Sequence, residues 1–178
     1  SGILVKPDTE ENKVKDEDDE AAATLKHLDE RIFESPAFAV ETAALEVVHM
    51  GQITYENVVR AIDSVLTVNS DEVETVFKTE QTINNMLTEY LIKVDNLSLT
   101  EKQKKVVNNL FYSVSDIERI GDHAENLAEQ AQYMVEHGLQ FSTTGMDDLK
   151  SISDSVLKSF QYAIDARQNG NMEAVRKV

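Results

Sequence analysis

The sequence predicts an all-α protein: an antiparallel bundle of long helices that holds one complete three-helix repeat and the start of a second. Three observations favour this class. Apolar residues recur at helical spacing over stretches of about 28 to 38 residues. Glycine and proline are scarce, with six Gly and two Pro in 178 residues. Short turns separate the periodic stretches, so consecutive helices are expected to pack antiparallel.

The charge balance and the absence of cysteine exclude several classes of protein. The formal net charge is −16, which leaves no basic face to neutralise the phosphates of a nucleic acid. We therefore expect no nucleic-acid partner. Without Cys, the chain has no disulfide, no thiolate metal site and no cysteine nucleophile. No apolar run approaches the ~18 residues of a membrane-spanning helix, so we expect no transmembrane helix in this segment.

The first helix is expected to follow an acidic arm. Residues 1–34 are polar and acidic, with the run Asp16–Glu20 near their centre, which is typical of a largely flexible linker. Ser35-Pro36 is a strong helix start, because a hydroxyl at the N-cap precedes proline at the first helical position. The predicted stripe of this helix reaches about residue 67 and consists of Ala44, Val48, Gly51, Tyr55, Val58, Ile62 and Leu66.

The second helix is expected to begin near Ser70, because Asp71 and Glu72 would place acidic side chains in its first turn, where they favour the helix dipole. Its apolar stripe consists of Val73, Val76, Phe77, Ile83, Leu87, Leu91 and Val94.

The third helix has clear signals at both ends. Thr100 and Gln103 form a capping-box pattern at its start, and Gly138 is a typical glycine just beyond a helix end. Small residues within its stripe would let a neighbouring helix approach closely. The stripe consists of Val106, Leu110, Val114, Ile117, Gly121, Ala124, Ala128, Ala131 and Val135.

A fourth helix is expected from about Asp147 to Gln168, and it is similar to the first. The segment Ala61-Ile62-Asp63 recurs as Ala163-Ile164-Asp165, and the residues beyond the following turn recur as well. A repeat of this kind indicates duplicated structural units. We therefore predict that the fourth helix is a second copy of the first helix.

The repeat divides the chain into two units. A complete three-helix unit covers residues 35–138, and residues 146–178 hold the first helix and the truncated second helix of the next unit. Truncation would leave an apolar face without its natural partners. We therefore expect a homodimer, with Val156, Phe160 and Ile164 on the exposed face.

Four carboxylates of the third helix form the most unusual pattern. Glu118, Asp122, Glu125 and Glu129 fall within roughly a 60° arc beside the apolar stripe. We call these four residues the carboxylate ledge. Like charges at this spacing destabilise a helix by a few tenths of a kcal/mol each. Either solvation or a bound cation must offset this repulsion.

Glu80 and Asn84 lie within the apolar stripe of the second helix. A buried carboxylate without a partner costs several kcal/mol or stays protonated. One interpretation is that the bundle is open there and Glu80 reaches water. The other is that both residues face the carboxylate ledge across a shared cation. Oxygen ligands suit hard or borderline divalent metals, and iron or zinc would also be accepted. The residues alone favour the solvated interpretation.

Signatures of an enzyme are absent, and we expect a non-enzymatic protein with no catalytic residues. There is no glycine-rich phosphate loop and no Gly-x-Ser-x-Gly motif. A di-iron site would need two inward Glu-x-x-His motifs. The single copy at Glu46–His49 lies on the face opposite the stripe of its helix. A hydrolase that uses a ledge-bound metal to activate water is a weaker hypothesis.

The string from Asp116 to Glu129, DIERIGDHAENLAE, closely resembles the signature helix of the PhoU family of phosphate-uptake regulators. The segment Leu28–Pro36 resembles the entry to the PhoU-like domain at the C-terminus of bacterial sodium/phosphate cotransporter-like membrane proteins. The resemblance implies two three-helix repeats and, in some members, multinuclear iron or zinc clusters bound through a Glu/Asp-x-x-x-Asp motif. Glu118 and Asp122 match that motif.

Two departures put a full metal cluster in doubt. Glu80-x-x-x-Asn84 carries an amide where the family pattern often has a carboxylate, and the second copy of the third helix is missing. On the resemblance, the chain is a regulatory domain at the cytoplasmic face of the plasma membrane, which modulates phosphate transport by packing against the membrane domain of the same transporter. The alternative is a stand-alone, metal-binding regulator of the PhoU type.

Overall fold

The computed structural model describes residues 30–170 and 172–178 and confirms the all-α class, because every regular element in these ranges is a helix. No helix in the described part of the chain is long and apolar enough to span a bilayer. The elements are η1 (Glu30–Glu34), α2 (Pro36–Thr67), α3 (Val73–Asp95), α4 (Glu101–His137), α5 (Thr143–Asn169) and α6 (Met172–Val175).

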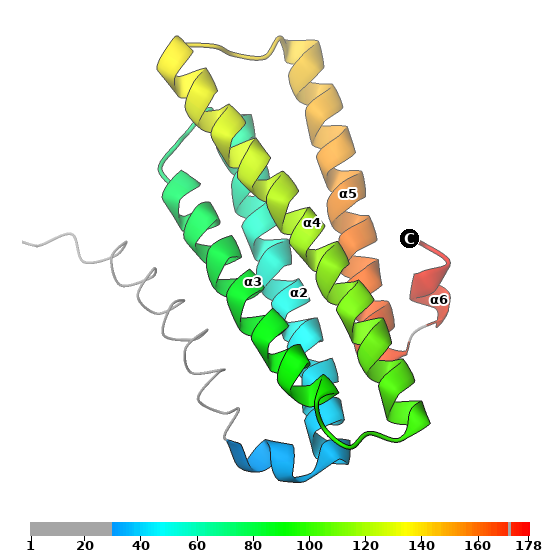
Figure 1. The fold of residues 1–178 in the computed structure, drawn as a ribbon. Coiled ribbons are helices and arrows are strands. Elements are labelled where there is room, and N and C mark those ends of the chain that lie inside the picture. Colours follow the sequence, from blue (N-terminus) through cyan, green and yellow to red (C-terminus); the bar gives the residue numbers. More distant parts are fainter. Residues whose placement is uncertain (1–29, 171) are drawn as a thin grey trace, which may run out of the picture.

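The four long helices alternate in direction and lie roughly along one axis (Figure 1). Helix α2 is central, because it contacts α3, α4 and α5. The side chains of six residues in the described ranges are not described: Glu30, Arg31, Asn84, Met86, Leu87 and Met172.

The last five residues of the predicted arm form a short 3-10 helix, η1, that packs on the bundle. Residues 1–29, which hold the rest of the predicted arm, lie outside the described residues. Phe33 of η1 packs on Tyr90 of α3, with ring centroids 5.4 Å apart. The Tyr90 hydroxyl donates a hydrogen bond to the carbonyl of Ala39 at 3.3 Å. The folded region therefore begins a few residues earlier than the sequence predicts.

Helix α2 begins where the sequence predicts, but its buried face is wider than the predicted stripe. Val48 and Tyr55 are only half buried, whereas Val47, Met50 and Thr54 are buried. The periodicity argument assumes a helix with one apolar side. Because α2 packs against three other helices, residues around more of its circumference are buried.

The predicted ends of α4 are confirmed. Thr100 Oγ1 accepts a hydrogen bond from the Gln103 N–H at 3.3 Å, and Gln103 Oε1 accepts one from the Thr100 N–H at 2.8 Å. Gly138 caps the other end with a left-handed backbone, at a φ of 60°, which glycine adopts without strain.

The buried faces of α3 and α4 follow the predicted stripes with changes at the edges. On α4, Val107 and Met134 are buried, whereas Val135 is 42% exposed. Three small residues of α4, Ala124, Ala128 and Ala131, have no exposed surface. These alanines allow α4 to lie close to α2, with which it makes its most extensive contact.

Helix α5 begins at Thr143, earlier than the predicted start at Asp147. The reason is a cap: Ser142 Oγ accepts a hydrogen bond from the Gly145 N–H at 3.1 Å. Of the dimer residues that the sequence predicts, Ile164 is buried against the bundle and Phe160 packs on Tyr55, with ring centroids 5.9 Å apart. Only Val156, at 50% exposure, remains on the surface as expected.

The capping box of α4 gives a stability test with an internal control. Thr100→Ala removes a hydrogen bond to an end N–H, so we expect it to lower the free energy of unfolding by about 1 kcal/mol. Ser35 precedes α2 without a side-chain cap bond, so Ser35→Ala is expected to change stability far less. Urea unfolding of the two variants beside the unmodified protein measures the difference. Equal losses would show that the capping box adds nothing.

Candidate functional site

Three helices meet at one polar cluster inside the bundle. Asn57 comes from α2, Glu80 from α3 and Gly121 from the middle of α4. Asn57 is 0% exposed and Glu80 is 1% exposed. Glu80 occupies a position of the apolar stripe of α3, between Val76 and Ile83, so the helix period directs its carboxyl into the core. The sequence-based placement of Glu80 in the stripe is confirmed, and the proposal that it reaches water is wrong for this structure.

Asn57 holds the Glu80 carboxyl in place. Its side-chain amide donates one hydrogen bond to Glu80 Oε1 at 2.9 Å and another to the carbonyl of Val76 at 2.9 Å. Both donor hydrogens of the amide are therefore used. The remaining oxygens, Asn57 Oδ1 and Glu80 Oε2, are buried without a hydrogen-bond partner in the described structure. A buried oxygen without a hydrogen bond lowers the stability of the folded protein. Apolar side chains of similar size would avoid this cost, so we treat the cluster as a candidate functional site.

Gly121 makes the room that the Glu80 carboxyl occupies. A methyl group built on Gly121 would overlap Glu80 Oε2 and the carboxyl carbon. The backbone of Gly121 is helical, so glycine is required here by space and not by an unusual φ angle. Glycine in a helix interior costs about 1 kcal/mol relative to alanine. Gly121 therefore lowers the intrinsic stability of α4, but it leaves a niche that is large enough for the Glu80 carboxyl group.

The surroundings of Glu80 favour its neutral form. Burial, together with the negative charges of Glu125 and Asp122, raises the pKa of Glu80 from its usual 4.5 to about 7. The hydrogen bond from Asn57 acts in the opposite direction and lowers this pKa. At neutral pH the carboxyl therefore lies close to its midpoint of protonation.

The carboxylate ledge borders this cluster, as the sequence suggests. Asp122 and Glu125 act electrostatically on Glu80, so they lie on the side of α4 that faces α3. Glu125 is half buried, and its pKa is raised by burial and by the charges of Asp122 and Glu129. Asp122, Glu118 and Glu129 are exposed. Asp122 and Glu129 thus repel Glu125 electrostatically, and Asp122 and Glu125 of the ledge lie beside the Glu80 niche.

The predicted metal site is not tested by this arrangement. The side chain of Asn84 lies outside the described part of the structure. Among the side chains that are described, no three acidic or imidazole groups are placed so that they could hold a metal ion. The donor types still suit a divalent cation, but as placed they do not form a complete ligand set.

Two fully buried polar residues of α2 lie outside the stripe that the sequence predicts. Asn57 and Thr54 are both 0% exposed, and Asn57 is the residue that fixes Glu80. The expected stripe of α2 did not include this side of the helix. A signal was nevertheless present: Gly121 in the small-residue stripe predicts a close neighbour, and Glu80 is the one acidic residue of α3 that the wheel directs inward.

The Glu46–His49 pair also differs from its prediction. The sequence places both residues on the face away from the core, but Glu46 is half buried and its Oε2 atom is buried without a hydrogen-bond partner. His49 Nδ1 lies 3.6 Å from that oxygen. The wider buried face of α2 explains the difference.

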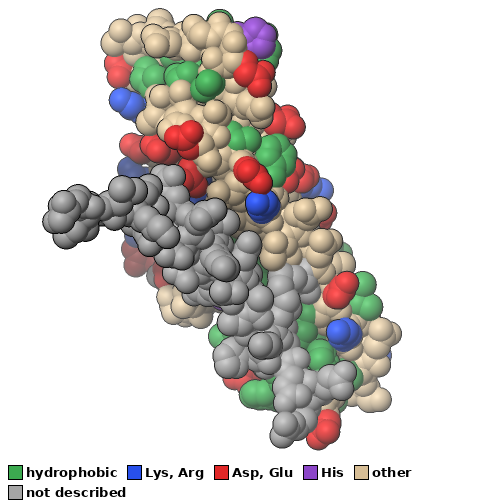
Figure 2. Space-filling view, turned by 90° about the vertical axis from the view of Figure 1, so that its left-hand side faces the viewer, with side chains coloured by type: hydrophobic (Ala, Val, Ile, Leu, Met, Phe, Trp, Pro, Cys, Tyr) green, Lys and Arg blue, Asp and Glu red, His purple; other side chains and the backbone are tan. Residues whose placement is uncertain are grey.

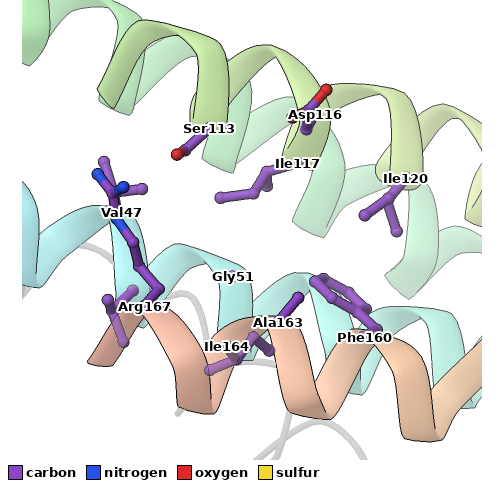
Figure 3. Close-up of a pocket in the computed structure, with 11 residues that line it drawn as sticks. Val47, Gly51, Ser113, Asp116, Ile117, Ile120, Phe160, Ala163, Ile164 and Arg167 are labelled. Carbon is purple, nitrogen blue, oxygen red and sulfur yellow. The ribbon is translucent and has the colours of Figure 1, made fainter. Parts of the chain in front are cut away.

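A groove also runs between α4 and α5, with α2 as its floor. One hollow in it is lined by Gly51 of α2, Ile120 of α4 and Phe160 of α5. Figure 3 shows the apolar side chains of this hollow directed toward one another, with Arg167 at one end and the Asp116 carboxylate directed away. A second apolar hollow continues from it along Ile120 toward Leu149. Most of the lining of both hollows is apolar; its polar residues are Ser113, Asp116 and Arg167 in the first and His123 and Ser153 in the second.

Comparison with protein families now identifies the fold. Residues 47–131 match the PhoU domain, a segment that includes all of α3 and most of α2 and of the signature helix α4. These residues form a PhoU domain, so the resemblance seen in the sequence is confirmed over this segment. No curated protein and no solved structure was found to match the chain.

The fit between Glu80 and Gly121 can be tested with paired glycine variants. We expect Gly121→Ala to lower the free energy of unfolding by about 1–3 kcal/mol, because the added methyl overlaps the carboxyl. Gly51→Ala is the control, since its Cβ would meet Ile117 and Ile164 at 3.7 Å, an ordinary contact. Gly51→Ala is expected to be neutral or stabilising. Adding Glu80→Ala to Gly121→Ala should recover part of the loss, and an unchanged loss would contradict the overlap.

The raised pKa of Glu80 predicts a pH-dependent stability. Because the folded state binds this proton more tightly than the unfolded chain, the stabilisation is complete below about pH 4.5 and is lost as the pH rises through about 7. The loss is about 3 kcal/mol. Urea unfolding at pH 5 and pH 8 should show most of this loss in the unmodified protein and none of it in Glu80→Gln. Glu74→Gln, at an exposed ion pair with Lys78, is the control and should keep the pH dependence of the unmodified protein.

Proposed function

We propose that this chain is the regulatory domain of a sodium/phosphate cotransporter-like membrane protein, in which it modulates phosphate transport. The observation that carries the proposal is the PhoU domain at residues 47–131, because PhoU domains are regulatory and non-enzymatic and act in phosphate transport. The attachment to a transporter rests on the resemblance of Leu28–Pro36 to the entry of such domains. The domain would then lie at the cytoplasmic face of the plasma membrane.

Two partners belong to this proposal. One is the membrane domain of the same transporter. The helical bundle would pack against this domain and thereby bias phosphate transport. The other is a second copy of the chain. A stand-alone phosphate-signalling regulator is the alternative, and it would need neither the membrane domain nor a fixed location at the membrane.

The proposal also includes cation binding at the carboxylate ledge, with iron, zinc or another divalent cation. Its support is Glu125, whose pKa is raised by burial and by the charges of Asp122 and Glu129. A bound cation would relieve the repulsion among these three carboxylates. Since the described side chains do not converge into a ligand set, binding requires new rotamers of the exposed ledge residues. When bound, the cation would supply positive charge beside the Glu80 niche.

Phosphate uptake in cells tests the regulatory function. The cells carry either the full transporter or the transporter without the region of residues 35–178. We expect the truncated form to lose the change in uptake rate that follows a shift from high to low phosphate, while basal transport persists. An unchanged response would contradict the proposal. Membrane fractionation separates the alternative, because a stand-alone regulator is recovered in the soluble fraction.

Elemental analysis and calorimetric titration with Fe²⁺, Zn²⁺ and Mn²⁺ test cation binding. Asp122→Asn and Glu118→Gln each remove one charged ligand, so we expect metal content and affinity to fall at least about tenfold. Glu74→Gln removes one exposed negative charge from α3 away from the ledge and is the control for net charge. Equal metal content in all these proteins would exclude a cation site at the ledge.

A further inference from the structure

Helix α5 presents a long face that the bundle does not cover. Only Ser153 and Ile164 are buried among its 27 residues. Ile152 and Val156 are 62% and 50% exposed, although both are large apolar side chains. The helix contacts α2 and the short α6 but packs little against α4. A helix of this length that buries so little of its surface leaves a face available for a partner.

The residues of this face are complementary to themselves. Ile152, Val156, Ser159 and Ala163 fall within roughly a 60° arc of the helix. If two copies of α5 lie antiparallel about a two-fold axis between residues 157 and 158, Ile152 lies opposite Ala163 of the second copy. Val156 then lies opposite Ser159. Each large side chain meets a small one, which allows two helices to pack closely. A two-fold axis repeats every such contact twice.

A hollow lies where this arrangement needs one. Ala163, Ala166 and Arg167 line it on α5, and Val175 and Val178 line it from α6 and the residues after it. Ile152 of a second copy would enter this hollow. Val175 and Val178 are themselves 50% and 64% exposed, so the inserted side chain would cover apolar surface from two segments.

The charges of α5 fit the same axis. Asp148 and Arg167 are both exposed near the two ends of the face. The antiparallel arrangement places Asp148 of each copy opposite Arg167 of the other. The dimer would then contain two ion pairs between the copies. The whole helix carries four Asp against three Lys or Arg, a net charge of −1, in a chain of net charge −16. Two copies therefore meet with little net repulsion at α5. Acidic side chains are spread over the side of the molecule that Figure 2 shows.

We infer that the exposed face of α5 is a homodimer interface, with Ile152 of each copy in the hollow beside Ala163 of the other and Asp148 paired with Arg167. This inference rests on the proposed self-association and names its surface. It requires no role in phosphate transport. Ile152 and Val156 also line the second hollow between α4 and α5, and Ala163 and Arg167 line the first, so this interface lies on the side of α5 that borders the groove.

Sedimentation velocity of the full chain over a range of concentrations tests the interface. We expect a dimer for the unmodified protein and a monomer for Ile152→Asp at the same concentrations. Leu45→Asp changes an equally exposed apolar residue, at 64% exposure on α2, and should leave the dimer unchanged. Circular dichroism of Ile152→Asp shows whether its helices remain folded, as expected for a side chain that the monomer does not bury.

A charge exchange identifies the pairing of residues. Asp148→Arg places like charges opposite each other twice per dimer, so we expect the dissociation constant to rise about tenfold or more. Combining Asp148→Arg with Arg167→Asp restores opposite charges and should bring the constant back to within about threefold of the unmodified value. If the protein dimerises and neither Ile152→Asp nor Asp148→Arg changes the dissociation constant, this interface is wrong but self-association stands. A monomer at every concentration would overturn both.

Discussion

The structure depends on one buried carboxyl group. Glu80 of α3 lies in a niche that Gly121 opens in α4, and Asn57 of α2 holds it there by a hydrogen bond of 2.9 Å. Each of the three helices of the PhoU domain supplies one part of this contact. A change in the position of any one helix would either close the niche or break the bond. The cluster therefore fixes how α2, α3 and α4 align in a bundle whose core is otherwise mostly apolar.

The same carboxyl group connects the core of the bundle to its surface. The charges of Asp122 and Glu125 on the carboxylate ledge raise the pKa of Glu80. An event that neutralises the ledge, such as protonation or binding of a cation, therefore lowers the pKa of a core residue. Through this coupling, a change of charge at the acidic surface alters the protonation of Glu80, and with it the contact that aligns the three helices.

Local signals in the sequence predicted local features well. Thr100, Gln103 and Gly138 gave the ends of α4, because caps depend on neighbouring residues. The helical wheel placed Glu80 in the core, because its position among apolar residues is a local property. Asn57 was missed because α2 is buried by three helices, and a single periodic stripe does not describe such a helix. The start of α5 was placed late because Thr143 and Gly145 are poor helix formers, and the cap from Ser142 outweighs their low propensity.

Nuclear magnetic resonance of the protein with ¹³C-labelled glutamate side chains measures the central claim directly. Glu80→Gln assigns the signal, and the chemical shift of its carboxyl carbon is followed from pH 3 to pH 9. A midpoint of about 7, moving downward in Asp122→Asn and Glu125→Gln, is the predicted result. A midpoint near 4.5, the usual pKa of a glutamate side chain, would show that Glu80 is solvated and that the three helices do not meet at a buried carboxyl.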